Sequence, residues 1–144
     1  MRAFACAISL ALALVACAGA RTPSRPAVPA AAKLSGPVVY VRSGGFAGVV
    51  ERLTVRPDGR ATLRLRSAVR HGRATDTRVR TLTRHLRGFG SIPADSRARH
   101  PIADGFTYSI TYARHTVRTD QGAVPAALRP ALDDLSAIGS SLGR

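Results

Sequence analysis

The side chains that could support acid–base or metal chemistry are few and dispersed along the chain. The only glutamate, Glu51, lies in an alternating apolar pattern typical of a strand. Asp133 and Asp134 occupy adjacent helical positions, which point in different directions, so they do not form a catalytic pair. The histidines are far apart in the sequence and form no metallopeptidase motif; they are His71, His85, His100 and His115. We therefore expect no enzymatic activity, no cofactor and no metal site.

Cys17 is the residue whose surroundings indicate a defined reaction. It ends the string Leu-Val-Ala-Cys, directly behind an apolar run over residues 3–16 that is too short to span a bilayer. A thiol at this position can take a diacylglycerol through a thioether, and the small residue before it lets a peptidase cut ahead of the cysteine. The pattern is similar to the lipobox of bacterial lipoproteins. It predicts a signal peptide over residues 1–16 and a lipid on Cys17.

Two other interpretations of this N-terminus stay open. Ala18-Gly19-Ala20 has the spacing of an ordinary signal-peptidase site, whose use would release a soluble protein, and Cys17 could be incidental. The cysteine count favours lipidation. The other cysteine, Cys6, lies in the segment to be removed, so the mature chain has no disulfide partner for Cys17. We expect an extracytoplasmic protein that is anchored to the bacterial cell membrane by its lipidated Cys17.

A flexible tether is expected between the anchor and the folded domain. Residues 17–37 are rich in proline and alanine and show no apolar period, which is typical of a partly extended linker. The remaining residues, 38–144, are enough for one domain. Their apolar residues alternate in several segments, where we expect strands. These segments are residues 38–41, 49–56, 62–66, 106–112 and 116–119, with a turn at residues 57–59.

Two helices are expected to cover this sheet. After a loop over residues 71–75, Asp76 can cap a helix whose apolar stripe is Val79, Leu82, Leu86 and Phe89. A second helix runs from about Pro125 to Leu142, with a kink or a true start near Pro130, because proline removes a hydrogen bond inside a helix. The order of elements predicts an α+β fold, in which an antiparallel sheet of about five strands has two helices packed on it.

The positive charge of the chain is carried almost entirely by arginine. The formal net charge is +14, and 21 of the 22 basic residues are arginine. Such a skew can follow from GC-rich codons, or it can serve to bind anionic lipid or glycopolymer. The candidate residues for an anionic surface are Arg64, Arg66, Arg80, Arg84 and Arg87. No nucleic acid partner is expected, because the compartment is wrong and no recognised motif accompanies the charge.

A glycine-rich segment with one aromatic ring is the candidate site for a protein partner. It is the string Arg42-Ser43-Gly44-Gly45-Phe46-Ala47-Gly48. Its glycines permit a sharp loop that could carry Phe46 into a partner's cleft. In the alternative interpretation the glycines form a bulge and Phe46 folds back into the core. Asp104, at the entry to the strand over 106–112, is the acid that could join this site; its other interpretation is a turn or a cap.

These motifs together resemble the emfourin family, whose members inhibit protealysin and related thermolysin-type metallopeptidases. The resemblance covers roughly residues 38–142 and rests on five blocks in the expected order, at residues 40–48, 104–110, 115–117, 124–125 and 128–130. It implies an α+β domain that binds a secreted thermolysin-like metallopeptidase. The leader, the tether and a longer hairpin around residues 57–59 depart from the family pattern. The alternative function is an envelope-structural module that binds anionic lipid or glycopolymer through its arginines.

Replacing Cys17 by alanine is expected to abolish lipid labelling and membrane association, because the thiol is the attachment point of the acyl chains. Partition of the wild-type and Cys17→Ala chains between detergent and aqueous phases measures this. The Cys6→Ala chain keeps the predicted attachment point and serves as the control. Unchanged partition of Cys17→Ala into the detergent phase would show that Cys17 is not lipidated.

Overall fold

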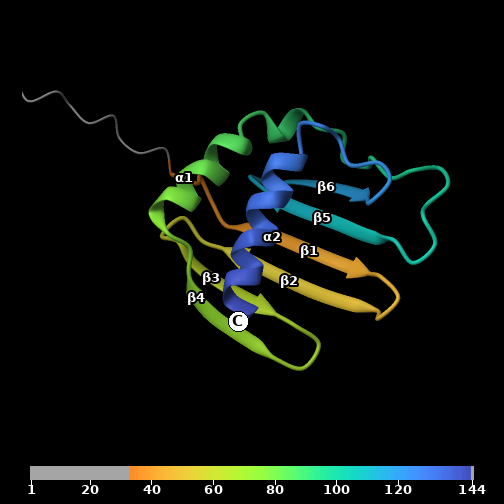
Figure 1. Ribbon diagram of the computed structural model, residues 1–144. Coiled ribbons are helices and arrows are strands. Elements are labelled where there is room, and N and C mark those ends of the chain that lie inside the picture. The colour runs from red at the N-terminus through yellow and green to blue at the C-terminus, as the bar shows by residue number, and fades with distance from the viewer. Residues whose placement is uncertain (1–32, 144) are drawn as a thin grey trace, which may run out of the picture.

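A computed structural model describes residues 33–143 of the chain (Figure 1). Cys17, the predicted signal peptide and most of the predicted tether lie outside these residues. The described elements are β1 (Val38–Gly44), β2 (Val49–Val55), β3 (Arg60–Arg64), β4 (Val69–Arg73), α1 (Asp76–His85), a short 3₁₀ helix (Phe89–Ser91), β5 (Phe106–Tyr112), β6 (His115–Asp120) and α2 (Arg129–Gly143). The predicted α+β class, with two helices on an antiparallel sheet, is confirmed.

The six strands form one sheet in the order β4-β3-β2-β1-β5-β6, and all neighbouring strands are antiparallel. β1 lies in the middle of the sheet and pairs with β2 and β5. Tyr40 of β1 stands opposite Leu53 on one side and Ile110 on the other. Since side chains alternate between the faces of a strand, these three residues share one face. Both helices pack on that face, with α2 crossing in front of the strands (Figure 1).

The core lies between this face and the helices. The predicted apolar stripe, Val79, Leu82, Leu86 and Phe89, is buried, and α2 contributes Leu135 and Ile138. The predicted helix is shorter than expected, because α1 ends at His85, so that Leu86 is its C-cap and Phe89 lies in the 3₁₀ helix. Leu34 is only 4% exposed and belongs to the same core, although the sequence places it in the tether. The packed part of the chain therefore begins before the boundary expected at Val38.

β4 is the element that the sequence analysis did not predict. The loop expected over residues 71–75 is wrong, because residues 69–73 pair with β3, His71 opposite Thr62. All five residues of β4 are exposed, so no alternation of buried and polar side chains marks the strand. Gly72 faces α2, and a Cβ there would meet the side chain of Leu142. Glycine at this position lets α2 lie close to the edge of the sheet.

The helix starts follow local chemistry. Thr75, and not Asp76, is the N-cap of α1, since its Oγ1 accepts a hydrogen bond from Arg78 N at 3.3 Å. Asp76 is the first helical residue, where a negative charge also favours the helix. α2 begins at Arg129, directly before Pro130, which confirms the start that proline geometry predicts.

Replacing Leu53 by alanine should lower the free energy of unfolding by about 2–5 kcal/mol, because the side chain is fully buried and leaves a cavity. Val50 lies on the same strand but is 52% exposed. Val50→Ala should therefore cost less than about 1 kcal/mol. Urea unfolding of both variants measures the difference. Equal losses would contradict a core built on one face of the sheet.

Candidate functional site

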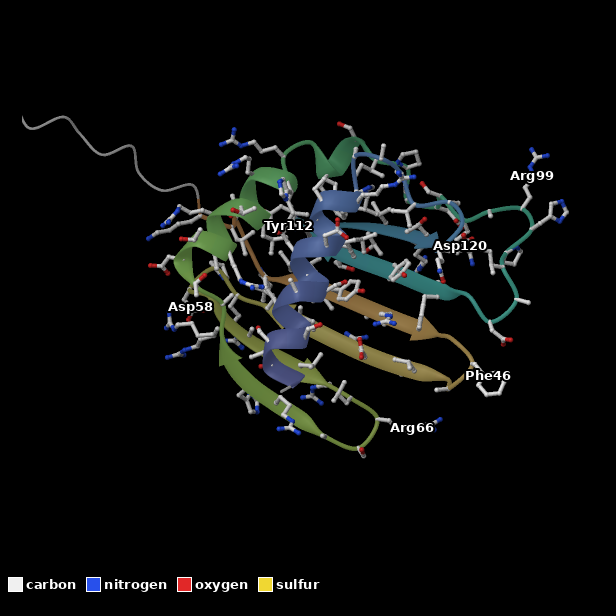
Figure 2. The ribbon with its side chains drawn as sticks, viewed as in Figure 1. Phe46, Asp58, Arg66, Arg99, Tyr112 and Asp120 are labelled. Atoms are coloured by element: carbon white, nitrogen blue, oxygen red, sulfur yellow. The ribbon has the colours of Figure 1, made fainter. Side chains whose placement is uncertain are left out.

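Three loops lie at one end of the sheet, which we call the loop end. They are the β1–β2 loop (residues 45–48), the β3–β4 turn (residues 65–68) and the part of the long loop before β5 that spans residues 99–105 (Figure 1). Phe46, Arg66 and Arg99 lie at this end, whereas Asp58 lies at the opposite end (Figure 2). The exposed large apolar side chains of the described residues all lie in or beside these loops; they are Phe46, Val50, Val69 and Ile102.

Phe46 is held in solvent by a closed turn. Gly48 N donates a hydrogen bond to Gly45 O at 2.9 Å, which closes the turn around Phe46 and Ala47. Gly44, Gly45 and Gly48 have φ angles of 108°, 74° and 57°, in the region that favours glycine. The Phe46 side chain is 96% exposed. The interpretation that folds this ring into the core is therefore wrong, because the turn directs it away from the sheet.

The β1–β2 loop rests on the loop that carries Asp104. Gly45 N donates a hydrogen bond to Gly105 O at 3.3 Å. A Cβ at Gly44 would clash with the same carbonyl oxygen, so the close approach of the two backbones requires glycine. The structure thus places Asp104 beside the 42–48 segment, as a shared site requires.

Asp104 itself is a turn residue. Gly105 N donates to Ile102 O at 3.0 Å, and Asp104 sits inside this turn with a φ of 57°. Aspartate tolerates that left-handed conformation better than most residues. The side chain is exposed, so it can also contact a partner that covers the loop end.

Arg42 has contacts within the domain that fix the base of the loop. Its guanidinium carbon lies 3.8 Å from the centre of the Phe106 ring, and its Nη1 lies 3.6 Å from Glu51 Oε2 on β2. The Phe106 ring in turn packs against Gly45, where a Cβ would lie 2.8 Å from a ring carbon. Tyr40 lies next to Arg42 on the same face of β1, and burial raises the pKa of its hydroxyl. This hydroxyl is 3.4 Å from Ser136 Oγ of α2. Arg42 therefore supports the turn rather than extending into solvent.

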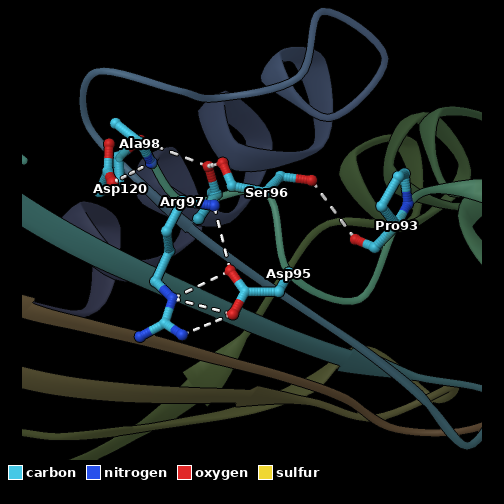
Figure 3. A network of polar contacts seen from close by, with 7 residues as sticks. Pro93, Asp95, Ser96, Arg97, Ala98 and Asp120 are labelled. Atoms are coloured by element: carbon cyan, nitrogen blue, oxygen red, sulfur yellow. Dashed lines mark hydrogen bonds and ion pairs between the residues drawn. The ribbon is translucent and has the colours of Figure 1, made fainter. Parts of the chain in front are cut away.

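Asp120 anchors the long loop to the sheet. Asp120 is buried, with 7% of the residue exposed, and its carboxylate accepts hydrogen bonds from Ala98 N at 2.7 Å and from Gly122 N at 2.9 Å. Beside it, Arg97 Nε donates to Asp95 Oδ1 at 2.9 Å (Figure 3). The hydrogen bonds from Arg97 lower the pKa of Asp95 to about 2. Sequence reasoning missed this anchor, because the contact that ties down the long loop joins Asp120 to Ala98, 22 residues away.

The predicted anionic-surface arginines do not form one surface. All five are exposed. Arg64 follows buried Leu63 on β3, so its side chain lies on the sheet face away from the helices, and Arg66 lies in the β3–β4 turn. The other three are on α1 or just after it, on the covered side of the sheet; they are Arg80, Arg84 and Arg87. The predicted set is therefore divided between the two sides of the sheet.

His85 and His115 contact other elements of the domain. His85 Nδ1 is 2.8 Å from Asp134 Oδ2, which joins α1 to α2, and His115 Nε2 donates to Ile92 O at 2.8 Å. Within residues 33–143, no three His, Cys, Asp or Glu side chains come together as a metal site. No helix in the described part of the chain is both long and apolar enough to cross a membrane.

Comparison with protein-family models and with curated proteins gives no match to this chain.

Replacing Gly44 by alanine should destabilise the domain more than replacing Gly48. Both residues have positive φ angles, which cost a non-glycine residue about 1–2 kcal/mol. At Gly44 the Cβ also clashes with Gly105 O, whereas at Gly48 it meets open space, so Gly44→Ala should cost at least about 1 kcal/mol more. Urea unfolding measures both. Equal costs would mean that the two loops do not pack as described.

Proposed function

We propose that this domain is a protein-binding module that inhibits a thermolysin-type metallopeptidase, with Phe46 as the side chain that enters the partner. The observation that carries the proposal is the 96% exposure of the Phe46 ring on a closed turn. An exposed phenylalanine forgoes the burial that a folded chain normally gives it. A partner pocket supplies that burial.

The turn is suited to binding because it is already ordered. A loop that is fixed before binding loses little conformational entropy when it meets its partner. Gly44 and Gly45 are packed against Gly105 and Phe106, which holds the turn in place. Aromatic anchors of this kind supply a large share of the binding energy at protein interfaces.

The surroundings of Phe46 also fit a protein interface. Ile102 is 55% exposed and lies in the neighbouring loop, and Asp104 and Arg66 supply charged groups further out. An apolar centre with a polar rim is the usual composition of such an interface.

The class of partner comes from the resemblance to emfourin and from the predicted location. The 42–48 segment and Asp104, which the sequence analysis named as partner-binding, lie beside each other at the loop end. A lipid on Cys17 would hold the inhibitor at the outer face of the membrane, where secreted peptidases act.

Replacing Phe46 by alanine should raise the inhibition constant against a sensitive thermolysin-type peptidase by about 30- to 1,000-fold, since a buried anchor is worth roughly 2–4 kcal/mol. The melting temperature should stay unchanged, because the ring contributes no core packing. Arg87→Ala, an exposed change beyond α1, is the control and should leave both quantities unchanged.

Two results would overturn this proposal. Wild-type inhibition by the Phe46→Ala chain would exclude the loop as the binding site. Failure of the unmutated chain to inhibit any peptidase of a thermolysin-type panel would exclude the inhibitory function.

A further inference from the structure

The second face of the sheet carries no helix within residues 33–143 (Figure 1). We call it the open face. On β2, β3 and β4 its side chains are those that alternate with buried Leu53, Ala61 and Leu63. Four of these side chains are arginines: Arg52, Arg60, Arg64 and Arg73.

The register of the sheet places these arginines directly opposite one another. Arg52 pairs with Arg64 across β2 and β3, and Arg60 pairs with Arg73 across β3 and β4. Like charges in such positions destabilise an antiparallel sheet. Thr54, Thr62 and His71 form the row between the two pairs, and Thr62 Oγ1 lies 3.2 Å from His71 Nδ1.

Carboxylates do little to neutralise the open face. Arg60 Nε lies 3.5 Å from Asp58 Oδ2 in the β2–β3 turn, and Arg73 donates to the backbone oxygen of Asp58. Within the described part of the chain, neither Arg52 nor Arg64 forms an ion pair. The surface is therefore complementary to an anionic partner.

Two exposed valines lie among these arginines and indicate which anionic partner fits. Val69 stands directly opposite Arg64, and Val50 precedes Arg52 on the same face; they are 49% and 52% exposed. Arginine beside exposed aliphatic side chains suits the interface of a bilayer, where guanidinium groups meet lipid phosphates and apolar groups enter the headgroup layer. A soluble polyanion has no apolar layer that Val50 and Val69 could enter.

We infer that the open face docks on an anionic phospholipid bilayer. The interaction does not depend on the inhibitory function, nor on the lipid at Cys17. With the open face on the membrane, the helices point away from it and the loop end stays at the side of the docked domain. Phe46 therefore remains reachable for a protein partner.

Arginine footprinting of the full chain tests this inference within one molecule. Phenylglyoxal modifies accessible arginines, and mass spectrometry reports the rate at each position. Vesicles of phosphatidylcholine and phosphatidylglycerol in equal amounts should slow modification of Arg52 and Arg64 several-fold, and added salt should reverse the effect. Arg80 and Arg84 on α1 are the internal control and should react at an unchanged rate. Vesicles of phosphatidylcholine alone should protect neither pair.

A pair of charge-matched variants sharpens the test. Each arginine near an anionic surface strengthens association roughly fivefold, so Arg52→Gln/Arg64→Gln should weaken docking roughly 30-fold, read as lost protection of Arg60 and Arg73. Arg80→Gln/Arg84→Gln removes the same charge and should leave that protection in place. The first variant should melt no lower than the wild type, because it removes a repulsive pair.

Three results would overturn the inference. Equal protection of the sheet and helix arginines would show attraction by net charge without a docking face. No protection by anionic vesicles would exclude the bilayer. Protection by soluble polyphosphate but not by vesicles would assign the face to a polymer instead.

Discussion

The rest of this structure depends on the burial of a single face of its sheet. Successive side chains of a strand point to opposite faces, so a strand that turns its leucines inward must turn its arginines outward. Both helices cover the same face, and the core from Leu34 to Ile138 lies on that side. A slip of one residue in any strand would exchange the two faces. This constraint fixes the register, and the register in turn produces the arginine pairs of the open face.

The loop end follows from the same sheet. β1 is bonded on both sides, by β2 and β5, so the loop after β1 and the loop before β5 must lie next to each other. Glycine at position 44 lets their backbones touch, because a Cβ there would clash with Gly105 O. Burying a phenylalanine is worth about 1.5–3 kcal/mol, yet the closed turn keeps Phe46 outside. A protein partner of the kind we propose would bury this ring on binding.

The sequence predicts those parts of the fold where one face of an element is buried. The strand at β5 and the burial of the apolar stripe from Val79 to Phe89 are of this kind, and both are confirmed. The helix itself is shorter than predicted, because α1 ends at His85 and Phe89 lies in the 3₁₀ helix. β4 escapes prediction because all its residues are exposed, so pairing with β3 leaves no pattern in its composition. The features of the candidate site also fall into these two groups, those that the local sequence marks and those that it does not. Glycine spacing marks the turn around Phe46, whereas the Asp120 anchor and the opposed arginines depend on pairings between distant residues, which only the folded chain specifies.

The most direct test of this one-sided sheet is the accessibility of methyl groups on its two faces. Nuclear magnetic resonance with a soluble paramagnetic agent measures it for neighbouring residues of the same strands. We expect strong broadening of the Thr54 and Thr62 methyl signals and little broadening of those of Leu53 and Leu63, which are buried beneath the helices. Protection of Thr54 and Thr62 equal to that of the two leucines would contradict this expectation, because the face that we describe as open would then be covered.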